Sequence, residues 1–391
     1  MHTIAAIRIL AAGTLATGIL LLPARAQEFK LLYSFGNTGD GQNPEAGLLE
    51  LGKTFYGTTQ AGGANGKGTV FAVSETGEET MLYSFAGGSG DGAGPVAGLA
   101  KLGASFYGVT DNGGEFSGGT AFAITGSGEE TVLHDFGDGN DGSNPFGTLR
   151  KAGKSLYGTT YAGGGANDQG TVFKLTPSGS ETVIHAFNDD NMNDGYRPVG
   201  GLIKVHKELY GTTSGGGANG WGTVFKISEA GDEIILYSFA GGSGDGAFPQ
   251  GNLIYYKGAF YGTTYQGGAN GHGTVFAVTP SGQETVLHSF GASGDGSDPE
   301  AGLIDFDGAF YGTTFDGGTG GRFGDGTIFS ITPSGDETVE HSFTNGSNDG
   351  GFPQAGMIKS GNTLYGTSTE GGTYAEGTIF AFMPGTPDTR R

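Results

Sequence analysis

The chain has 391 residues, including 83 glycines and no cysteine, and it carries a net charge of −21 at pH 7. Without cysteine there is no disulfide framework, no thiol nucleophile and no cysteine-ligated metal. The excess of carboxylates repels phosphate backbones and anionic membrane faces, which excludes nucleic acid as a partner. The 27 Phe and 16 Tyr are too many aromatic residues for a disordered chain, so the composition indicates a turn-rich folded repeat.

Residues 1–26 have the features of a secretory signal peptide. Arg8 precedes an apolar run from Ile9 to Leu22, and Ala24-Arg25-Ala26 supplies a small-x-small cleavage pattern. The run is shorter than the roughly 18 apolar residues that a membrane-spanning helix needs. We expect cleavage before Gln27, no membrane insertion afterwards, and a periplasmic or extracellular location. Loss of the two arginines takes the net charge to −23.

Residues 27–383 contain seven copies of one unit of about 51 residues. A Tyr-Gly dipeptide follows Phe or Leu at Tyr56, Tyr107, Tyr157, Tyr210, Tyr261, Tyr311 and Tyr365. A Gly-Thr-(Val/Ile/Ala)-Phe segment ends at Phe71, Phe122, Phe173, Phe225, Phe276, Phe329 and Phe380. An Asp-Gly-x-x-Pro segment starts at Asp40, Asp91, Asp141, Asp194, Asp245, Asp295 and Asp349. All three series count to seven.

Each unit is predicted to form four short strands. In the fifth unit these are residues 251–256, 259–264, 273–279 and 284–290, which are rich in β-branched and aromatic side chains. Glycine, proline, asparagine and serine separate them, as in tight turns. No segment after residue 26 shows an apolar period of 3.6 residues, so the sequence predicts no helix there.

This pattern predicts an all-β, seven-bladed β-propeller, because a four-stranded unit buries both its faces when copies stack in a ring. Residues 29–35 match the fourth strand of a unit, whereas the last unit stops after its third strand, at residues 377–383. We therefore expect the N-terminal strand to complete the seventh blade and close the ring by 3+1 pairing. Residues 384–391 form a short polar tail.

The three segments together resemble the GloVer-type extracellular β-propeller tandem repeat, a bacterial family. The motifs that carry the resemblance are (Leu/Phe)-Tyr-Gly-Thr-Thr, Gly-Thr-Val-Phe and Asp-Gly-x-x-Pro, and they cover Phe29 to Met383. The resemblance implies an exported propeller and transfers no activity. The kelch repeat is a more distant likeness.

The Asp-Gly-x-x-Pro and Gly-Gly loops are predicted to share one face of the propeller. The aspartates are interpreted as turn residues that accept backbone N–H bonds, although carboxylates also suit Ca²⁺. Asp189, Asp190 and Asp194 form the densest group and only loosely resemble a calcium loop. The sequence predicts no other cofactor.

Side chains that depart from the repeat are the candidate binding residues. They are Trp221, Tyr196, Arg197, His272 and Arg322, the last beside Phe323. They predict a shallow patch for a glycan or peptide, because Trp, Tyr and Arg dominate binding hot spots; drift at exposed loop tips is the alternative. The four strand-4 histidines replace tyrosines and are interpreted as packing residues: His134, His185, His288 and His341.

The preferred function is a monomeric binding module for a glycan, a peptide or a cell-surface protein. The alternatives are an extracytoplasmic polysaccharide lyase or hydrolase that uses the central funnel, and a structural envelope or matrix protein. An enzyme needs an unrepeated acid or base where strand 1 starts, near the axis. The positions assigned there carry no titratable side chain, which favours binding: Ala46, Ala97, Thr148, Gly201, Asn252, Ala301 and Ala355.

Overall fold

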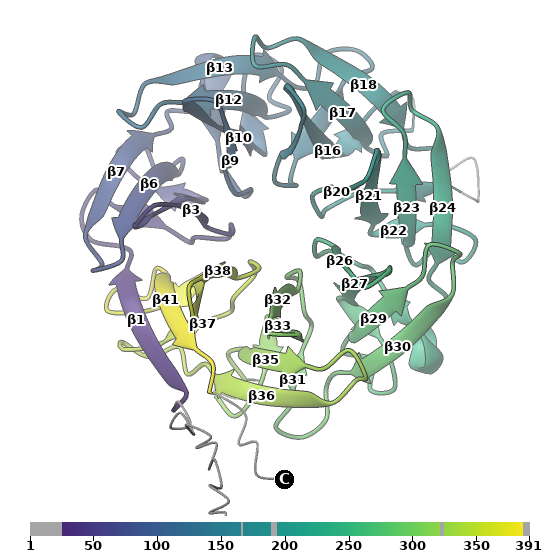
Figure 1. The fold of residues 1–391 in the computed structure, drawn as a ribbon. Coiled ribbons are helices and arrows are strands. Elements are labelled where there is room, and N and C mark those ends of the chain that lie inside the picture. Colours follow the sequence, from purple (N-terminus) through teal and green to yellow (C-terminus); the bar gives the residue numbers. More distant parts are fainter. Residues whose placement is uncertain (1–25, 166, 189–193, 321–323, 386–391) are drawn as a thin grey trace, which may run out of the picture.

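Seven antiparallel sheets, six of four strands and one of five, stand around a central axis in the computed structural model of the chain, as Figure 1 shows. The structure describes residues 26–165, 167–188, 194–320 and 324–385. Most of the predicted signal peptide and tail lie outside these ranges, as do four residues of the candidate sites: Asp189, Asp190, Arg322 and Phe323. The predicted seven-bladed propeller is confirmed.

In every blade the first strand lies nearest the axis and the fourth forms the outer rim (Figure 1). The strands of blades 1 and 2 are β3 (Leu49–Leu51), β4 (Thr54–Thr59), β6 (Thr69–Ser74), β7 (Glu79–Ser84), β9 (Ala100–Leu102), β10 (Ser105–Thr110), β12 (Thr120–Ile124) and β13 (Glu130–Asp135). Those of blades 3 and 4 are β15 (Arg150–Ala152), β16 (Ser155–Gly163), β17 (Thr171–Leu175), β18 (Glu181–Ala186), β20 (Ile203–Val205), β21 (Glu208–Thr213), β23 (Thr223–Ile227) and β24 (Glu233–Ser238).

The remaining blades follow the same order. The strands of blades 5 and 6 are β26 (Ile254–Tyr256), β27 (Ala259–Thr264), β29 (Thr274–Val278), β30 (Glu284–Ser289), β32 (Ile304–Phe306), β33 (Ala309–Thr314), β35 (Thr327–Ile331) and β36 (Glu337–Ser342). Blade 7 contains β38 (Ile358–Ser360), β39 (Thr363–Ser368), β41 (Thr378–Met383) and β1 (Glu28–Ser34).

The second strand of the fifth unit has the predicted bounds, and the other three strands are shorter than predicted. Strand 1 was expected from residue 251, but β26 begins at Ile254. The reason is that the chain at Gly251 lies against the next blade, where a Cβ would be 2.6 Å from the Ala301 carbonyl group, and does not pair with β27.

Short two-residue ladders, which the sequence did not predict, tie the Asp-Gly loop of each unit to its Gly-Gly loop. They pair β2 (Gly41–Gln42) with β5 (Ala61–Gly62), β8 (Gly92–Ala93) with β11 (Asn112–Gly113), β19 (Gly195–Tyr196) with β22 (Gly215–Gly216), β25 (Gly246–Ala247) with β28 (Gln266–Gly267), β31 (Gly296–Ser297) with β34 (Asp316–Gly317), and β37 (Gly350–Gly351) with β40 (Glu370–Gly371), while β14 (Gly142–Pro145) pairs with β16. These pairs place both loop series on one face of the ring, as predicted.

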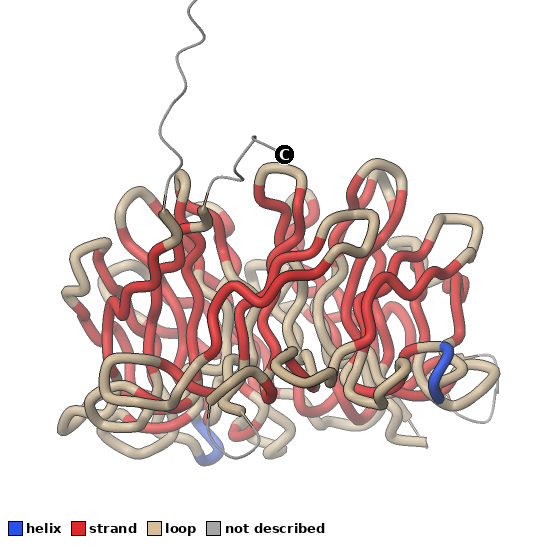
Figure 2. Tube along the Cα trace, turned by 90° about the horizontal axis from the view of Figure 1, so that it is seen from below, coloured by secondary structure: helices blue, strands red, loops and turns tan. Residues whose placement is uncertain are grey.

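Two single-turn 3-10 helices, η1 (Gly88–Gly90) and η2 (Gly242–Gly244), lie on that same face, drawn in blue in Figure 2. The prediction of no helix was wrong to this extent, because a Gly-Gly-Ser-Gly loop is short enough to close as one tight turn. In the part of the chain that the structure describes, no helix has the length and apolar character to cross a membrane.

The Tyr-Gly motif is explained by packing within each blade. Gly57 in strand 2 pairs with Phe71 in strand 3, and a Cβ on this glycine would lie 2.5 Å from the Phe71 ring. The phenylalanine ring therefore folds over the glycine and is buried between neighbouring blades. The same Gly-Phe pairing recurs at Gly262 and Phe276, so the repeated motif encodes the core.

The ring closes between its two ends. β1 pairs with β41 from Glu28 opposite Met383 to Ser34 opposite Thr378, with one register shift between Leu31 and Tyr33, and the two strands lie beside each other in purple and yellow in Figure 1. Phe35, directly after β1, is fully buried. The predicted 3+1 closure by the N-terminal strand is confirmed.

Deletion of residues 28–35 is predicted to destabilise the whole ring. Each fully buried apolar side chain contributes about 1.5–3 kcal/mol, and the deletion also leaves β41 as an open edge that promotes aggregation. Equilibrium denaturant unfolding measures the loss, and Lys30→Ala, at an exposed position of β1, is the control that keeps the strand. An unchanged unfolding midpoint for the truncated chain would contradict the closure.

Candidate functional site

The seven inner strands surround a funnel of about 550 Å³ on the propeller axis. Its wall is made by the segments that lead into strand 1 of each blade: residues 45–48, 96–99, 146–148, 199–201, 250–252, 300–303 and 354–358. Its volume lies within the range of small-molecule binding sites, which is about 300–1,000 Å³. The funnel is therefore the first place to look for side chains that break the repeat.

One position of the funnel wall differs from blade to blade. It is the residue directly after the loop proline, which is half-buried in each blade: Glu45, Val96, Phe146, Val199, Gln250, Glu300 and Gln354. Blades 5, 6, 7 and 1 contribute amides and carboxyls, whereas blades 2, 3 and 4 contribute apolar groups. The wall thus has a hydrogen-bonding half and an apolar half.

This arrangement corrects the expectation that no titratable group stands near the axis. The seven positions taken from the sequence are not equivalent in the repeat. Ala46 and its equivalents stand two residues after the loop proline, whereas Thr148, Gly201 and Asn252 stand three residues after it. Residues at these positions also line the funnel, but none of them is titratable. Thr148 in addition bonds across to the neighbouring blade, since its hydroxyl accepts a hydrogen bond from Gly98 N at 3.0 Å. The carboxyls lie one residue earlier.

The chain turns sharply before each funnel residue. The residue before the loop proline has a positive φ in all seven blades, for example 53° at Asn43 and 55° at Asp298. At Arg197, whose φ is 55°, the backbone N–H donates to Gln169 O at 2.8 Å and the carbonyl accepts from Ser214 N at 3.1 Å. The left-handed turn and these bonds set the direction of the side chain that follows the proline.

The two funnel glutamates have strongly perturbed acidity. Burial raises the pKa of Glu45 to about 7, and the negative charges of Asp111 and Glu300 add to the shift. Burial also raises the pKa of Glu300 to about 7, and a hydrogen bond with Gln354 only partly offsets it. Near neutral pH both groups can therefore donate or accept a proton.

Part of the predicted patch extends from the apolar half of the funnel. The Phe146 ring lies 5.7 Å from the Tyr161 ring. The Arg197 guanidinium lies 5.5 Å from the Tyr161 ring and 5.8 Å from the Tyr196 ring. Arg197 is exposed and Tyr196 half-buried. Together they form an aromatic row, Phe146–Tyr161–Arg197, from the funnel to the loop face.

The other predicted patch residues lie at two further junctions between blades. Trp221 is 41 % exposed, and its ring packs edge-on at 5.1 Å against Phe248 of the next blade. His272 Nδ1 lies 3.5 Å from Asp298 Oδ2. Each side chain is thus engaged at its own junction on the loop face, and a binding role for these residues stays a prediction.

The repeated loop aspartates hold backbone groups, as the structural interpretation requires. Asp245 Oδ1 accepts from Gly246 N at 2.6 Å, and Oδ2 accepts from Ala240 N at 2.6 Å and from the Tyr237 hydroxyl at 2.8 Å. Equivalent bonds from the following glycine reach Asp40, Asp91, Asp141, Asp194, Asp295 and Asp349. We call this arrangement the aspartate clamp.

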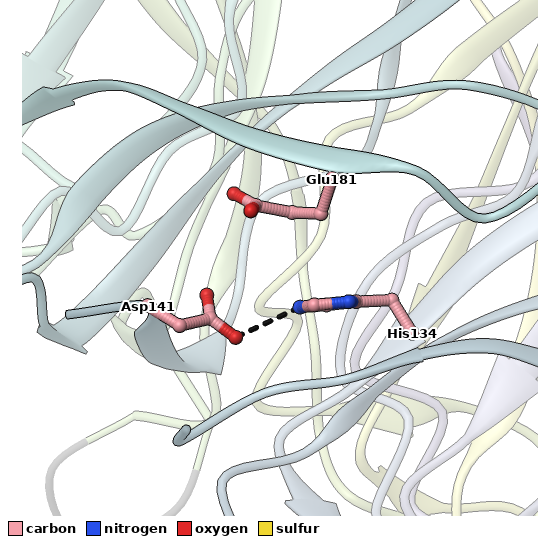
Figure 3. Close-up of side chains that lie close together, drawn as sticks. All are labelled: His134, Asp141 and Glu181. Carbon is pink, nitrogen blue, oxygen red and sulfur yellow. Dashed lines mark hydrogen bonds and ion pairs between the residues drawn. The ribbon is translucent and has the colours of Figure 1, made fainter. Parts of the chain in front are cut away.

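A second carboxyl group from the next blade lies beside most of these clamps. In Figure 3, Glu181 from β18 extends toward the pair formed by His134 and Asp141, whose Nε2 and Oδ2 atoms are 2.8 Å apart. Glutamates at this position have one buried Oε1 without a hydrogen-bond partner: Glu79, Glu130, Glu181, Glu233, Glu284 and Glu337. Burial, together with the neighbouring aspartate, raises the pKa of Glu284 to about 7. The sequence analysis missed these glutamates because their partners belong to another blade.

Comparisons with known proteins agree with this fold. The family described as a Gloeobacter/Verrucomicrobia repeat matches residues 11–168 and 162–380. No curated protein sequence matches the chain.

Solved structures resemble the chain only in fold. The structure of a puromycin hydrolase is 12 % identical with a TM-score of 0.51, and the match covers 84 % of this chain and 50 % of that one, so the chain spans about half of the hydrolase. A putative 6-phosphogluconolactonase from Bacteroides uniformis is 14 % identical with a TM-score of 0.49, over 78 % of this chain and 86 % of that one.

The raised pKa values of the glutamates beside the aspartate clamps, which we call the junction glutamates, predict that the free energy of unfolding falls as the pH rises. Because the folded state raises the pKa of Glu79, Glu130 and Glu284 to about 7, it retains protons that the unfolded chain loses above pH of about 4.5. Their stabilising contribution is complete below that pH and is lost as the pH rises through about 7. Thermal melts from pH 4.5 to 8, with a chelator present, should show a falling melting temperature.

Glu284→Gln is the diagnostic variant for this effect. The neutral amide should leave the stability at pH 4.5 nearly unchanged and make the variant more stable than the parent at pH 8. Glu78→Gln, at an exposed position, is the matched control and should follow the parent curve. A Glu284→Gln curve parallel to that of the parent would refute the assignment.

Proposed function

We propose that the chain, which belongs to the Gloeobacter/Verrucomicrobia repeat family over most of its length, is a binding module that receives a ligand in the central funnel, because side chains that differ from blade to blade line its wall. The observation that carries the proposal is the divided funnel wall. One side of the cavity is lined by Val96, Phe146 and Val199, and the other side is lined by Glu45, Gln250, Glu300 and Gln354.

The chemistry of the wall favours a glycan end as the ligand. Amide and carboxyl groups hydrogen-bond hydroxyl groups, and apolar and aromatic side chains contact the C–H faces of a sugar ring. The lining residues include two acids and no Lys, Arg or His, so the funnel favours a neutral or cationic ligand over a polyanion. A neutral glycan satisfies both halves of the wall.

A longer ligand has further contacts on the loop face. The aromatic row leads from the funnel to Tyr161 and Arg197, and Trp221 lies exposed one junction further along the ring. Aromatic and arginine side chains make the strongest contacts at binding surfaces. A glycan or peptide that extends beyond the funnel would meet these residues next.

We place this module outside the cytoplasm, in keeping with the expected signal peptide. Cleavage before Gln27 leaves β1, which begins at Glu28, complete for ring closure. The matching test is the N-terminal sequence of the chain recovered from the periplasm or medium.

A second candidate function, polysaccharide cleavage, rests on a different observation. Glu45 and Glu300 both have a pKa near 7 in the same cavity, and general acid–base catalysis is most efficient when the pKa lies near the working pH. In this case one glutamate would transfer protons while the other orients the sugar. Product analysis after incubation with a bound glycan distinguishes turnover from binding.

Binding is tested with a glycan array and the purified mature chain. For a glycan found in this way, Phe146→Ala and Glu300→Gln should each weaken binding by about tenfold or more, because both contacts come from a desolvated wall. Ile234→Ala, at a rim position that is 51 % exposed, is the control and should bind like the parent. Full affinity in both funnel variants would contradict a funnel site.

Trp221→Ala separates the funnel from the loop face. A ligand confined to the funnel should bind this variant with the affinity of the parent, whereas an extended ligand should lose about 2 kcal/mol. The chain has one tryptophan, so quenching of its fluorescence reports contact with the loop face directly.

A further inference from the structure

We propose that three junctions between blades bind a divalent transition metal such as Zn²⁺. Among the described residues, three clusters each bring one histidine nitrogen and two carboxylate oxygens within 4.8 Å of one another: His134, Asp141 and Glu181; His185, Asp194 and Glu233; His288, Asp295 and Glu337. They lie at the outer rim, away from the funnel, so the inference is independent of the proposed function.

The three ligands of each cluster come from parts of the chain that the ring brings together. In the first cluster, His134 lies in the outer strand β13, Asp141 belongs to the following loop, and Glu181 begins β18 of the next blade (Figure 3). Asp141 uses Oδ1 for the backbone N–H of Gly142, which leaves Oδ2 toward the imidazole. The backbone therefore fixes the aspartate before any metal arrives.

The second cluster contains potential metal-ligand atoms that the described part of the chain leaves without hydrogen bonds. His185 Nε2 is buried and lies 3.5 Å from Asp194 Oδ2, and it makes no hydrogen bond to any described residue. Glu233 Oε1 is likewise buried without a partner, and Asp194 is only 6 % exposed. A buried polar atom without a partner costs free energy, and a metal ion between these atoms would remove that cost at both.

The third cluster repeats the first. His288 Nε2 lies 3.0 Å from Asp295 Oδ2, Gly296 N donates to Oδ1 at 2.7 Å, and Glu337 Oε1 is buried without a partner. The same donor set thus occurs at three junctions, with the aspartate held by the backbone each time.

The donor set suits zinc. Imidazole nitrogen and carboxylate oxygen bind Zn²⁺ at about 2.0–2.2 Å, which places tetrahedral ligand atoms about 3.3 Å apart. Atoms within 4.8 Å of one another reach that spacing through small side-chain rotations of the glutamate. The fourth position is open to water, and the imidazole disfavours Mg²⁺ and Ca²⁺, which prefer oxygen ligands.

Other junctions of the same chain provide natural controls. Tyr83 and Tyr237 replace the histidine, and their hydroxyls donate to Asp91 and Asp245 at 3.0 and 2.8 Å. These junctions retain both carboxyls but offer no nitrogen ligand, and they show that tyrosine fits at this position.

The junction of His341 lacks the glutamate instead. Phe29 pairs with Phe382 as Glu79 pairs with Val73, so phenylalanine occupies the glutamate position. Its ring stacks on His341 with centroids 4.0 Å apart. His341 keeps its contact with Asp349 at 3.0 Å but faces an apolar ring where the other clusters present a carboxyl.

The test is a titration of the chelator-treated full chain with Zn²⁺ by calorimetry, supported by Co²⁺ absorption spectra. The parent should bind three equivalents, and His134→Tyr, His185→Tyr and His288→Tyr should each remove one. The triple variant should lose these sites, with at least 100-fold weaker binding and no zinc-induced rise in melting temperature. His341→Tyr should still bind three.

Three results would overturn the proposal. They are a parent chain that binds no stoichiometric Zn²⁺, a triple variant that binds as the parent does, and a His341→Tyr variant that loses an equivalent like the others. If the triple variant does not fold, the three single variants decide, since each changes one junction to the chemistry that the chain already uses at Tyr237.

Discussion

The ring depends on one repeated interaction, the aspartate clamp. In each loop that leads into a blade, the carboxylate accepts a hydrogen bond from the backbone N–H of the glycine that follows it, and at Asp245 it also holds Ala240 N and the Tyr237 hydroxyl. The clamp joins the outer strand of one blade to the loop that starts the next. Charge-assisted bonds of this kind are stronger than neutral ones, so seven clamps fix the angle at which successive blades meet.

The residues that recur in every unit, including those of the aspartate clamp, have structural roles. Aspartates, glycines and phenylalanines that recur in every unit are accounted for by backbone bonds and by packing, as at Gly57 beneath Phe71. Function is left to the positions that vary. These lie in three places: the funnel wall, which is lined by both Phe146 and Glu300; the loop face, where Arg197 and Trp221 depart from the repeat; and the outer junctions, where some blades have histidine and others tyrosine beside the carboxyls. A propeller of identical blades can thus hold unlike sites.

The sequence predicted the blades well because the information is local. The strand at Ala259–Thr264 was placed with its observed bounds, and the match of residues 29–35 to an outer strand predicted the ring closure. The funnel glutamates were missed because the alternation of apolar and polar residues that marks a strand is absent there. A residue with positive φ and a proline precede both Glu45 and Glu300. In the first blade the segment pairs with no strand until residue 49. The junction of Asp141 with Glu181 spans forty positions and exists only in the ring.

The most direct test of this account is equilibrium unfolding of Asp245→Asn. The amide keeps the shape of the side chain but turns one acceptor into a donor that faces Ala240 N–H and the Tyr237 hydroxyl. We predict a loss of about 2–4 kcal/mol in the free energy of unfolding, because two donors then lose their acceptor in a buried site. Asp232→Asn, in an exposed turn, should change it by less than about 0.5 kcal/mol. Equal stability of the two variants would contradict the role of the clamp.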